Sequence, residues 1–102
     1  MERMVLTVFR SRLKPGVEAE LEPVGARMYE LAASMPGFVS YREYQAADGE
    51  GVAIVEFESE AALAAWRNHP EHREVQARAR SQWFVDYRIQ VCEVVRDYSF
   101  KT

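Results

Sequence analysis

Three predicted strands carry apolar side chains on both of their faces, and this feature limits the folds that the chain can adopt. The alternating residues are Met4, Leu6 and Val8 against Val5 and Phe9 in 4–12, Val52 and Ile54 against Ala53, Val55 and Phe57 in 51–58, and Ile89, Val91 and Val95 against Cys92 and Val94 in 87–96. Successive side chains of a strand point to opposite faces of its sheet. Both faces are therefore expected to be buried, although scattered exposed apolar residues are also normal in proteins.

The other segments alternate with these strands. Apolar residues spaced by four and three positions predict a helix over 17–35, with either an irregular first turn or a later start because of Pro23. Asp48-Gly49-Glu50-Gly51 predicts a hairpin turn, and Ser59 predicts a helix N-cap. Pro70 separates two further helices. The predicted order is a strand (4–12), a helix (17–35), two strands (38–45 and 51–58), two helices (60–68 and 71–83) and a last strand (87–96).

This order predicts the α+β class with the ferredoxin-like split βαβ topology, a four-stranded antiparallel sheet with its helices on one face. Helices on one face leave the other face open, so we expect a homodimer in which two sheets pack face to face. The 102 residues correspond to a single domain, 1–102. A domain of this size has a small core, which a second subunit would enlarge.

Composition argues against several classes of partner. The net charge of −3 gives no broad attraction to nucleic acid or to an anionic membrane, and no apolar run is long enough to span a bilayer. RNA-recognition domains share the topology, but Glu50, Val52 and Ile54 stand where their third strand has a basic residue and two base-stacking aromatics. Cys92 is the only cysteine, and the first residues lack a signal-peptide layout, so a reduced cytoplasmic location is expected.

The segment 66–72 holds the strongest candidates for a chemical site. Both histidines of the chain, His69 and His72, lie beside Pro70 in this break between helices. A helical projection of 71–83 places His72 on an inward stripe with the residues Val75, Gln76, Ala79 and Trp83. Trp66 shares the inward face of the preceding helix with Leu63. We therefore expect Trp66 and His72 to flank one pocket, and the alternative is that His72 is a hydrogen-bonded core histidine.

The remaining polar residues of the break give weaker indications. His69 is expected to be exposed, and Asn68 is equally consistent with a helix C-cap. His69 and His72 are three residues apart, but Pro70 interrupts the helix that would align them, and no nearby side chains complete a ligand set, so no metal site is expected. The chain also lacks a Gly-x-Ser-x-Gly nucleophile motif and a phosphate-binding glycine loop.

Four segments together resemble the antibiotic biosynthesis monooxygenase (ABM) family, of the dimeric α+β barrel superfamily. They are Met35-Pro36-Gly37-Phe38, Val55-Glu56-Phe57-Glu58-Ser59, Ala65-Trp66-Arg67-Asn68-His69-Pro70-Glu71-His72, and residues 91–100. The resemblance implies a homodimer whose two sheets form a barrel. It also implies that each subunit keeps a pocket between its sheet and its helices.

The family divides in chemistry. Some members oxidise phenols with O₂ and no cofactor, and others bind and degrade heme. Heme-degrading relatives have a histidine about ten residues after the tryptophan and an asparagine on the first strand, where this chain has Gln76 and Phe9. The resemblance therefore favours O₂ chemistry without a cofactor over heme cleavage. Heme binding through His72 is the alternative.

The expected reaction is oxidation of a phenolic or quinol-like small molecule. His72 is the candidate base, because an imidazole with a pKa near the operating pH suits proton abstraction. Trp66 and Trp83 are expected to wall the pocket, Asn68 and Gln76 to bind substrate oxygens, and Phe9 to contact the substrate. A dimer that holds an aromatic ligand without turning it over, and an isomerase or cyclase, need the same kind of pocket.

Overall fold

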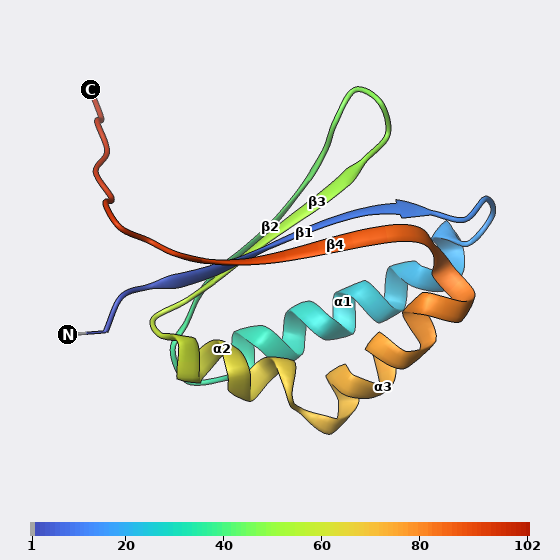
Figure 1. Ribbon diagram of the computed structural model, residues 1–102, viewed down its shortest axis with the longest axis horizontal. Coiled ribbons are helices and arrows are strands. Elements are labelled where there is room, and N and C mark those ends of the chain that lie inside the picture. Colours follow the sequence, from blue (N-terminus) through green and yellow to red (C-terminus); the bar gives the residue numbers. More distant parts are fainter. Residues whose placement is uncertain (1) are drawn as a thin grey trace.

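A four-stranded antiparallel sheet with its helices on one face makes up the computed structural model, which describes residues 2–102 (Figure 1). The elements in chain order are β1 (Val5–Leu13), α1 (Glu18–Ser34), β2 (Phe38–Gln45), β3 (Gly51–Phe57), α2 (Glu60–Arg67), α3 (Pro70–Arg78), η1, a π-helical turn (Ala79–Trp83), and β4 (Phe84–Glu93). The strand order β2-β3-β1-β4 confirms the predicted ferredoxin-like α+β fold. In residues 2–102, every helix is too short or too polar to cross a bilayer.

The register of the strands decides which side chains face the helices. Val5 pairs with Phe57, and Thr7 pairs with Val55, so these side chains lie on one face. That face forms the hydrophobic core with α1 and α2. The buried residues of the core are Val5, Met28, Leu31, Ala32, Val55, Phe57, Leu63 and Trp66.

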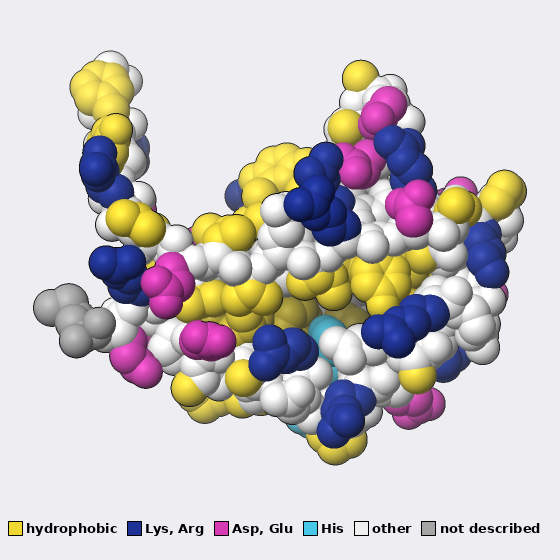
Figure 2. Space-filling view, viewed as in Figure 1, with side chains coloured by type: hydrophobic (Ala, Val, Ile, Leu, Met, Phe, Trp, Pro, Cys, Tyr) yellow, Lys and Arg dark blue, Asp and Glu magenta, His cyan; other side chains and the backbone are white. Residues whose placement is uncertain are grey.

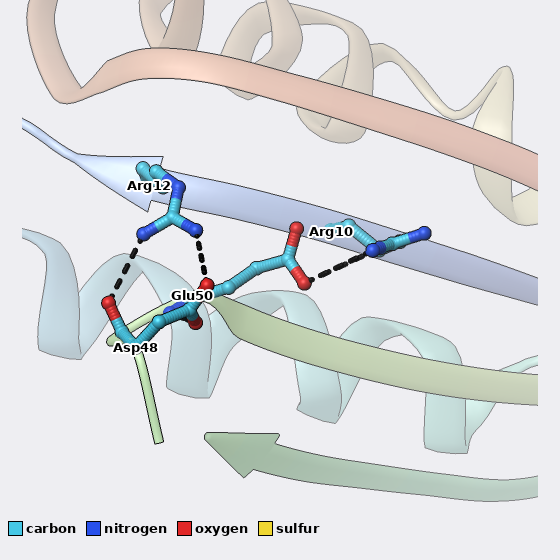
Figure 3. A network of polar contacts seen from close by, with 4 residues as sticks. All are labelled: Arg10, Arg12, Asp48 and Glu50. Carbon is cyan, nitrogen blue, oxygen red and sulfur yellow. Dashed lines mark hydrogen bonds and ion pairs between the residues drawn. The ribbon is translucent and has the colours of Figure 1, made fainter. Parts of the chain in front are cut away.

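The opposite face of the sheet carries no helix (Figure 1). Its central apolar residues are Leu6, Val8, Val52 and Ile54. At the hairpin end of this face Arg10 pairs with Glu50 at 3.2 Å and Arg12 pairs with Asp48 at 2.7 Å (Figure 3). Strands β1 and β3 are thus apolar on both faces, as predicted. The prediction was wrong for β4, whose face away from the helices carries Asp86, Arg88 and Gln90 beside Cys92. The helix-free face therefore combines an apolar centre with charged residues at one end and along β4.

Side-chain caps define the break between α2 and α3. The Ser59 hydroxyl accepts a hydrogen bond from the Ala62 N–H at 3.1 Å, which confirms the predicted N-cap of α2. Asn68 is the C-cap residue of α2. His69 Nδ1 accepts a hydrogen bond from the Glu71 N–H at 3.1 Å, so His69 is the N-cap of α3. Pro70 is the first residue of α3, where its missing N–H costs nothing.

The structure differs from the prediction in three elements. The last strand begins at Phe84 and ends at Glu93, not at 87 and 96, because β4 pairs only with β1 and no partner remains beyond the bond from the Val94 N–H to the Met4 carbonyl. The helix predicted over 71–83 changes from α-helical to π-helical geometry at Ala79. Helix α1 begins at Glu18 and continues through Pro23, whose missing N–H removes one hydrogen bond inside the helix.

The loop before β2 approaches α2 closely at Gly37. Gly37 has a φ of 84°, a left-handed conformation that other residues rarely adopt. A Cβ atom there would lie 2.8 Å from the Ala62 Cβ. Both the backbone conformation and the contact therefore require glycine.

We expect Gly37→Ala to lower the free energy of unfolding by about 2 kcal/mol or more, from the left-handed backbone and the clash with Ala62. Gly25→Ala is the matched control, because Gly25 lies inside α1, where an added Cβ would meet nothing within 4 Å. It should raise stability by about 0.5–1 kcal/mol through helix propensity. Urea unfolding of both variants tests this, and equal effects of the two substitutions would contradict it.

Candidate functional site

A hollow opens between the sheet and the helices, and a histidine side chain is visible inside it (Figure 2). Its sheet wall includes the helix-facing side of β4, where Ile89 pairs with Phe9 and Val91 pairs with Thr7. Ile89 and Val91 are each 47% exposed, because no helix covers this edge of the sheet. The hollow therefore has an apolar wall that is open to a ligand.

Trp66 forms the inner end of this site. Helix α2 buries it against the sheet, where its ring centroid lies 5.8 Å from Phe57 and 6.3 Å from Tyr41. The imidazole of His72 meets the indole edge-on, with 4.4 Å between the ring centroids. The structure thus brings together the two residues that the helical projection placed around one pocket.

The environment of His72 differs from the expectation of a pKa near neutrality. Burial lowers the pKa of His72 to about 4, and the positive charges of His69 and Arg67 lower it further. The imidazole is therefore neutral at pH 7. A group with such a low pKa is a weak base. His72 can therefore remove a proton efficiently only from a substrate that is more acidic than the sequence analysis assumed.

Two buried nitrogen atoms of this pair lack hydrogen-bond partners among the described residues. They are Nε1 of Trp66 and Nδ1 of His72. Nearly all buried polar groups in proteins are paired, and each unpaired one costs about 1–3 kcal/mol. Two such atoms lie on neighbouring rings here. A bound molecule, or a small shift of neighbouring groups, would supply the missing hydrogen-bond partners.

Two more predicted residues have partly buried positions. Gln76 is half-buried on α3, one turn after His72. Phe9 faces the helix side of β1 and packs against Phe84 and Tyr87, with ring centroids 5.4 and 5.5 Å away. The Arg80 guanidinium donates a hydrogen bond to the Tyr87 hydroxyl at 2.7 Å. Phe9 is thus part of an aromatic group on the sheet.

The structure gives Trp83 and Asn68 other surroundings. Trp83 is fully buried, donates from Nε1 to Glu20 of α1 at 3.2 Å, and has the Arg78 guanidinium 4.7 Å above its ring. Asn68 is exposed at the end of α2. Within residues 2–102, no ring contact or side-chain hydrogen bond connects either residue to the Trp66–His72 pair. The π-helical turn changes the direction of Trp83, which an ideal helical projection does not represent.

Sequence reasoning missed two neighbours of the pair. Tyr41 contacts Trp66 from β2, and burial raises the pKa of Tyr41 to about 12. Arg67 is close enough to His72 to affect its pKa. The alternation of β2 is shifted near Phe38 by an irregular register, so no simple period-two pattern identifies Tyr41.

Two observations bear on a metal ion and on heme as possible ligands. No group of three His, Cys, Asp or Glu side chains comes together anywhere in residues 2–102. Gln76 occupies the position at which the family resemblance implies the histidine of heme-degrading relatives, and a glutamine amide is not among the usual axial ligands of heme iron. The ring of His72 packs against the ring of Trp66, and its Nδ1 is buried.

Known proteins share the sequence pattern and the fold. The family model described as antibiotic biosynthesis monooxygenase matches residues 4–78. The uncharacterized protein YqjZ of Bacillus subtilis (strain 168) is 36% identical over 75 residues, which are 74% of this chain and 66% of that protein, slightly under two thirds of its length. Rv0793 from Mycobacterium tuberculosis superposes with a TM-score of 0.82 at 23% identity, over 94% of this chain and 99% of that one. SnoaB, a cofactor-independent oxygenase from Streptomyces nogalater, superposes with a TM-score of 0.76 at 22% identity, over 94% and 96%.

Stability should depend on pH through His72. The folded pKa of about 4 lies below the ordinary 6.5, so between these values the unfolded chain binds a proton that the folded chain does not. The free energy of unfolding should therefore fall as the pH falls from 6.5 to about 4. His72→Gln should reduce this slope by up to about 1.4 kcal/mol per pH unit. Denaturant unfolding across this range tests it, and an unchanged slope would show that His72 titrates normally.

Hemin provides a test of the alternative cofactor. Because Gln76 replaces the expected axial histidine, titration with hemin should give no sharp Soret band, and no loss of heme when a reductant is supplied. The absorption spectrum measures both. Stoichiometric binding followed by ring cleavage would place the chain in the heme branch of the family.

Proposed function

Because the chain belongs to the antibiotic biosynthesis monooxygenase family, we propose that it oxidises a phenolic or quinol-like aromatic molecule with O₂ and without a cofactor. The observation that carries this proposal is the neutral His72 beside Trp66, with unpaired nitrogens, in an apolar hollow. A flat aromatic ring suits the apolar walls, and its oxygen suits a hydrogen bond with the imidazole of His72. The cofactor-independent oxygenase SnoaB, which has the same fold, supports the proposal.

The proposed reaction uses the electrons of the substrate itself. The phenolate passes one electron to O₂, and the resulting radical and superoxide combine into a ring-carbon peroxide. A solvent proton converts the peroxide into a hydroperoxide. Loss of the proton from the ring carbon then breaks the O–O bond and expels hydroxide, which becomes water. Overall one oxygen atom enters the ring, the other leaves as water with the two hydrogens lost from C–H and O–H, and the substrate supplies all four electrons.

Each residue of the hollow has a proposed role. His72 contacts the substrate oxygen, and Trp66 supports both the ring and the imidazole. Phe9 contributes to the sheet wall, and Gln76 offers an amide to a second substrate oxygen. We leave Trp83 and Asn68 outside the site, because Trp83 binds Glu20 and Asn68 caps α2.

We further propose that two copies pack through the helix-free face of the sheet. No helix covers the apolar centre of this face, which consists of Leu6 and Val8 of β1 and Val52 and Ile54 of β3. The segment after β4 projects from the body on the side away from the helices (Figure 1). Tyr98 and Phe100 in this segment are 83% and 87% exposed. A second sheet on this face would cover the apolar centre and lie beside the segment.

A second candidate function is an aromatic-ligand-binding dimer that performs no reaction. The low pKa of His72 favours it, because a weak base activates a phenol poorly. Both candidates predict binding of an aromatic molecule in the hollow. Only the oxygenase consumes O₂ in proportion to the substrate.

Turnover should depend on His72 and not on His69. With a hydroquinone and O₂, we expect His72→Ala to lower kcat/KM by roughly 10²-fold or more, the range for losing a group that acts on a reacting oxygen. His69→Asn should change it little, because asparagine keeps the N-cap of α3. Oxygen-electrode kinetics and circular dichroism on both variants test this. Equal losses in the two variants, or a folded His72→Ala with full activity, would contradict the proposed role.

Light scattering at micromolar concentration should give about twice the chain mass of 11.8 kDa. Deleting residues 97–102 should weaken dimerisation by roughly tenfold or more, since burial of one aromatic side chain contributes about 1.5–3 kcal/mol. Deleting only 101–102 is the control, because it keeps Tyr98 and Phe100. A stable monomer, or equal dissociation constants for the two truncations, would count against this arrangement.

A further inference from the structure

The neutral imidazole of His72 has one proton to place on two nitrogens. Nδ1 is buried and has no hydrogen-bond partner among the described residues. Buried N–H groups without an acceptor are rarer in proteins than buried acceptors without a donor. The proton is therefore assigned to Nε2 and not to Nδ1. Nε2 is not among the buried unpaired side-chain nitrogens of the described residues, so we take it as the nitrogen that a ligand in the hollow can reach. His72 therefore presents an N–H donor to a ligand.

The charges that act on His72 favour an anion at the same place. Besides burial, the pKa of His72 is lowered by Arg67 at the end of α2, whose guanidinium stays positively charged at neutral pH, and by His69 at the start of α3 when that imidazole is protonated. No carboxylate acts on it, and the nearby Glu71 is bound by the Arg27 guanidinium. From the sheet side, Tyr41 touches Trp66 as a neutral phenol, because its pKa is about 12. The hollow thus combines a donor with a positive field.

We infer that the hollow binds its aromatic ligand as the phenolate, with Nε2–H of His72 donating a hydrogen bond to the phenolate oxygen. A fixed donor in a water-poor site stabilises an oxyanion more than it would in water. The phenol proton leaves to solvent when the ligand binds, and no bond other than the O–H bond breaks. His72 then acts as a neutral donor and not as a base, a role that a lowered imidazole pKa permits. The inference rests on the proposed function only in taking the ligand to be phenolic.

The phenolate is also the form that passes an electron to O₂ in the proposed reaction. A site that selects this form therefore prepares the substrate without any protein base. Acidic phenols, whose anions are populated near neutral pH, are accordingly the preferred substrate class. This assignment replaces the general base with a pKa near the operating pH that the sequence predicted, and it agrees with an imidazole whose pKa is about 4.

The probe for this inference is 4-nitrophenol, whose anion is yellow and whose neutral form is not. Saturating protein should lower the apparent pKa of the bound dye by about one pH unit or more, since a hydrogen bond to a charged group contributes about 1.5–3 kcal/mol. At the pH where the free dye is half ionised, addition of protein should increase the yellow absorption. A raised pKa, an unchanged pKa, or no binding at millimolar concentration would overturn the inference.

Substitutions of His72 separate a donor from a base. His72→Gln places an amide N–H near the position of Nε2 and has no basic nitrogen, so it should keep most of the pKa shift. His72→Ala should lose it, and His72→Glu should reverse it, because a carboxylate repels the phenolate. His72→Asn, whose amide reaches only the Nδ1 position, is the positional control and should behave like His72→Ala. Circular dichroism establishes which variants fold, and retention of the shift in His72→Glu but not in His72→Gln would identify a base instead.

The outcomes distinguish this inference from the proposed function. The nitrophenol assay measures ionisation and needs no O₂ consumption. If hydroquinones are not oxidised but the dye pKa falls, the oxygenase proposal fails and the phenolate site stands. If hydroquinones are oxidised while the dye pKa rises on binding, the oxygenase proposal stands and the phenolate site is wrong.

Discussion

The indole of Trp66 joins the hydrophobic core to the candidate site. One part of the ring packs on Phe57 of β3, and the edge of the His72 imidazole packs against it from α3. The position of His72 therefore depends on the same contact that holds α2 on the sheet. The break at Pro70, with His69 as its cap, sets the start of α3 so that its first turn reaches the indole. Fold and site share these residues, so changes to the core at Trp66 also change the site.

Much of the fold follows from local patterns in the sequence. Period-two alternation predicts β1 and β3, a 3–4 stripe predicts α1, and Ser59 and Pro70 limit α2. The Trp66–His72 contact was also predictable, because each residue lies on the inward stripe of its own helix. These features depend on residues that are near one another in the chain, and pattern reasoning represents such relations well.

The remaining features depend on contacts between distant segments. Trp83 binds Glu20 across the helix layer, and the end of β4 is set by where β1 ends. The pKa of His72 depends on how completely neighbouring elements exclude water, and its tautomer depends on the absence of an acceptor near Nδ1 within the described chain. A sequence gives the identity of a titratable residue but not its solvation. For the base predicted from residue type alone, the folded chain has an imidazole with a lowered pKa, for which we propose the role of a neutral hydrogen-bond donor.

The most direct measurement follows the oxygen atoms. The purified protein, without added metal, flavin or reductant, is supplied with a hydroquinone under ¹⁸O₂, and the organic product and the water are analysed by mass spectrometry. Oxygenation by the substrate's own electrons predicts one ¹⁸O atom in the hydroxyquinone and one in water, at a rate proportional to protein and dependent on His72. A quinone that contains no ¹⁸O and forms together with hydrogen peroxide would contradict the account, because it would show two-electron oxidation without oxygen insertion.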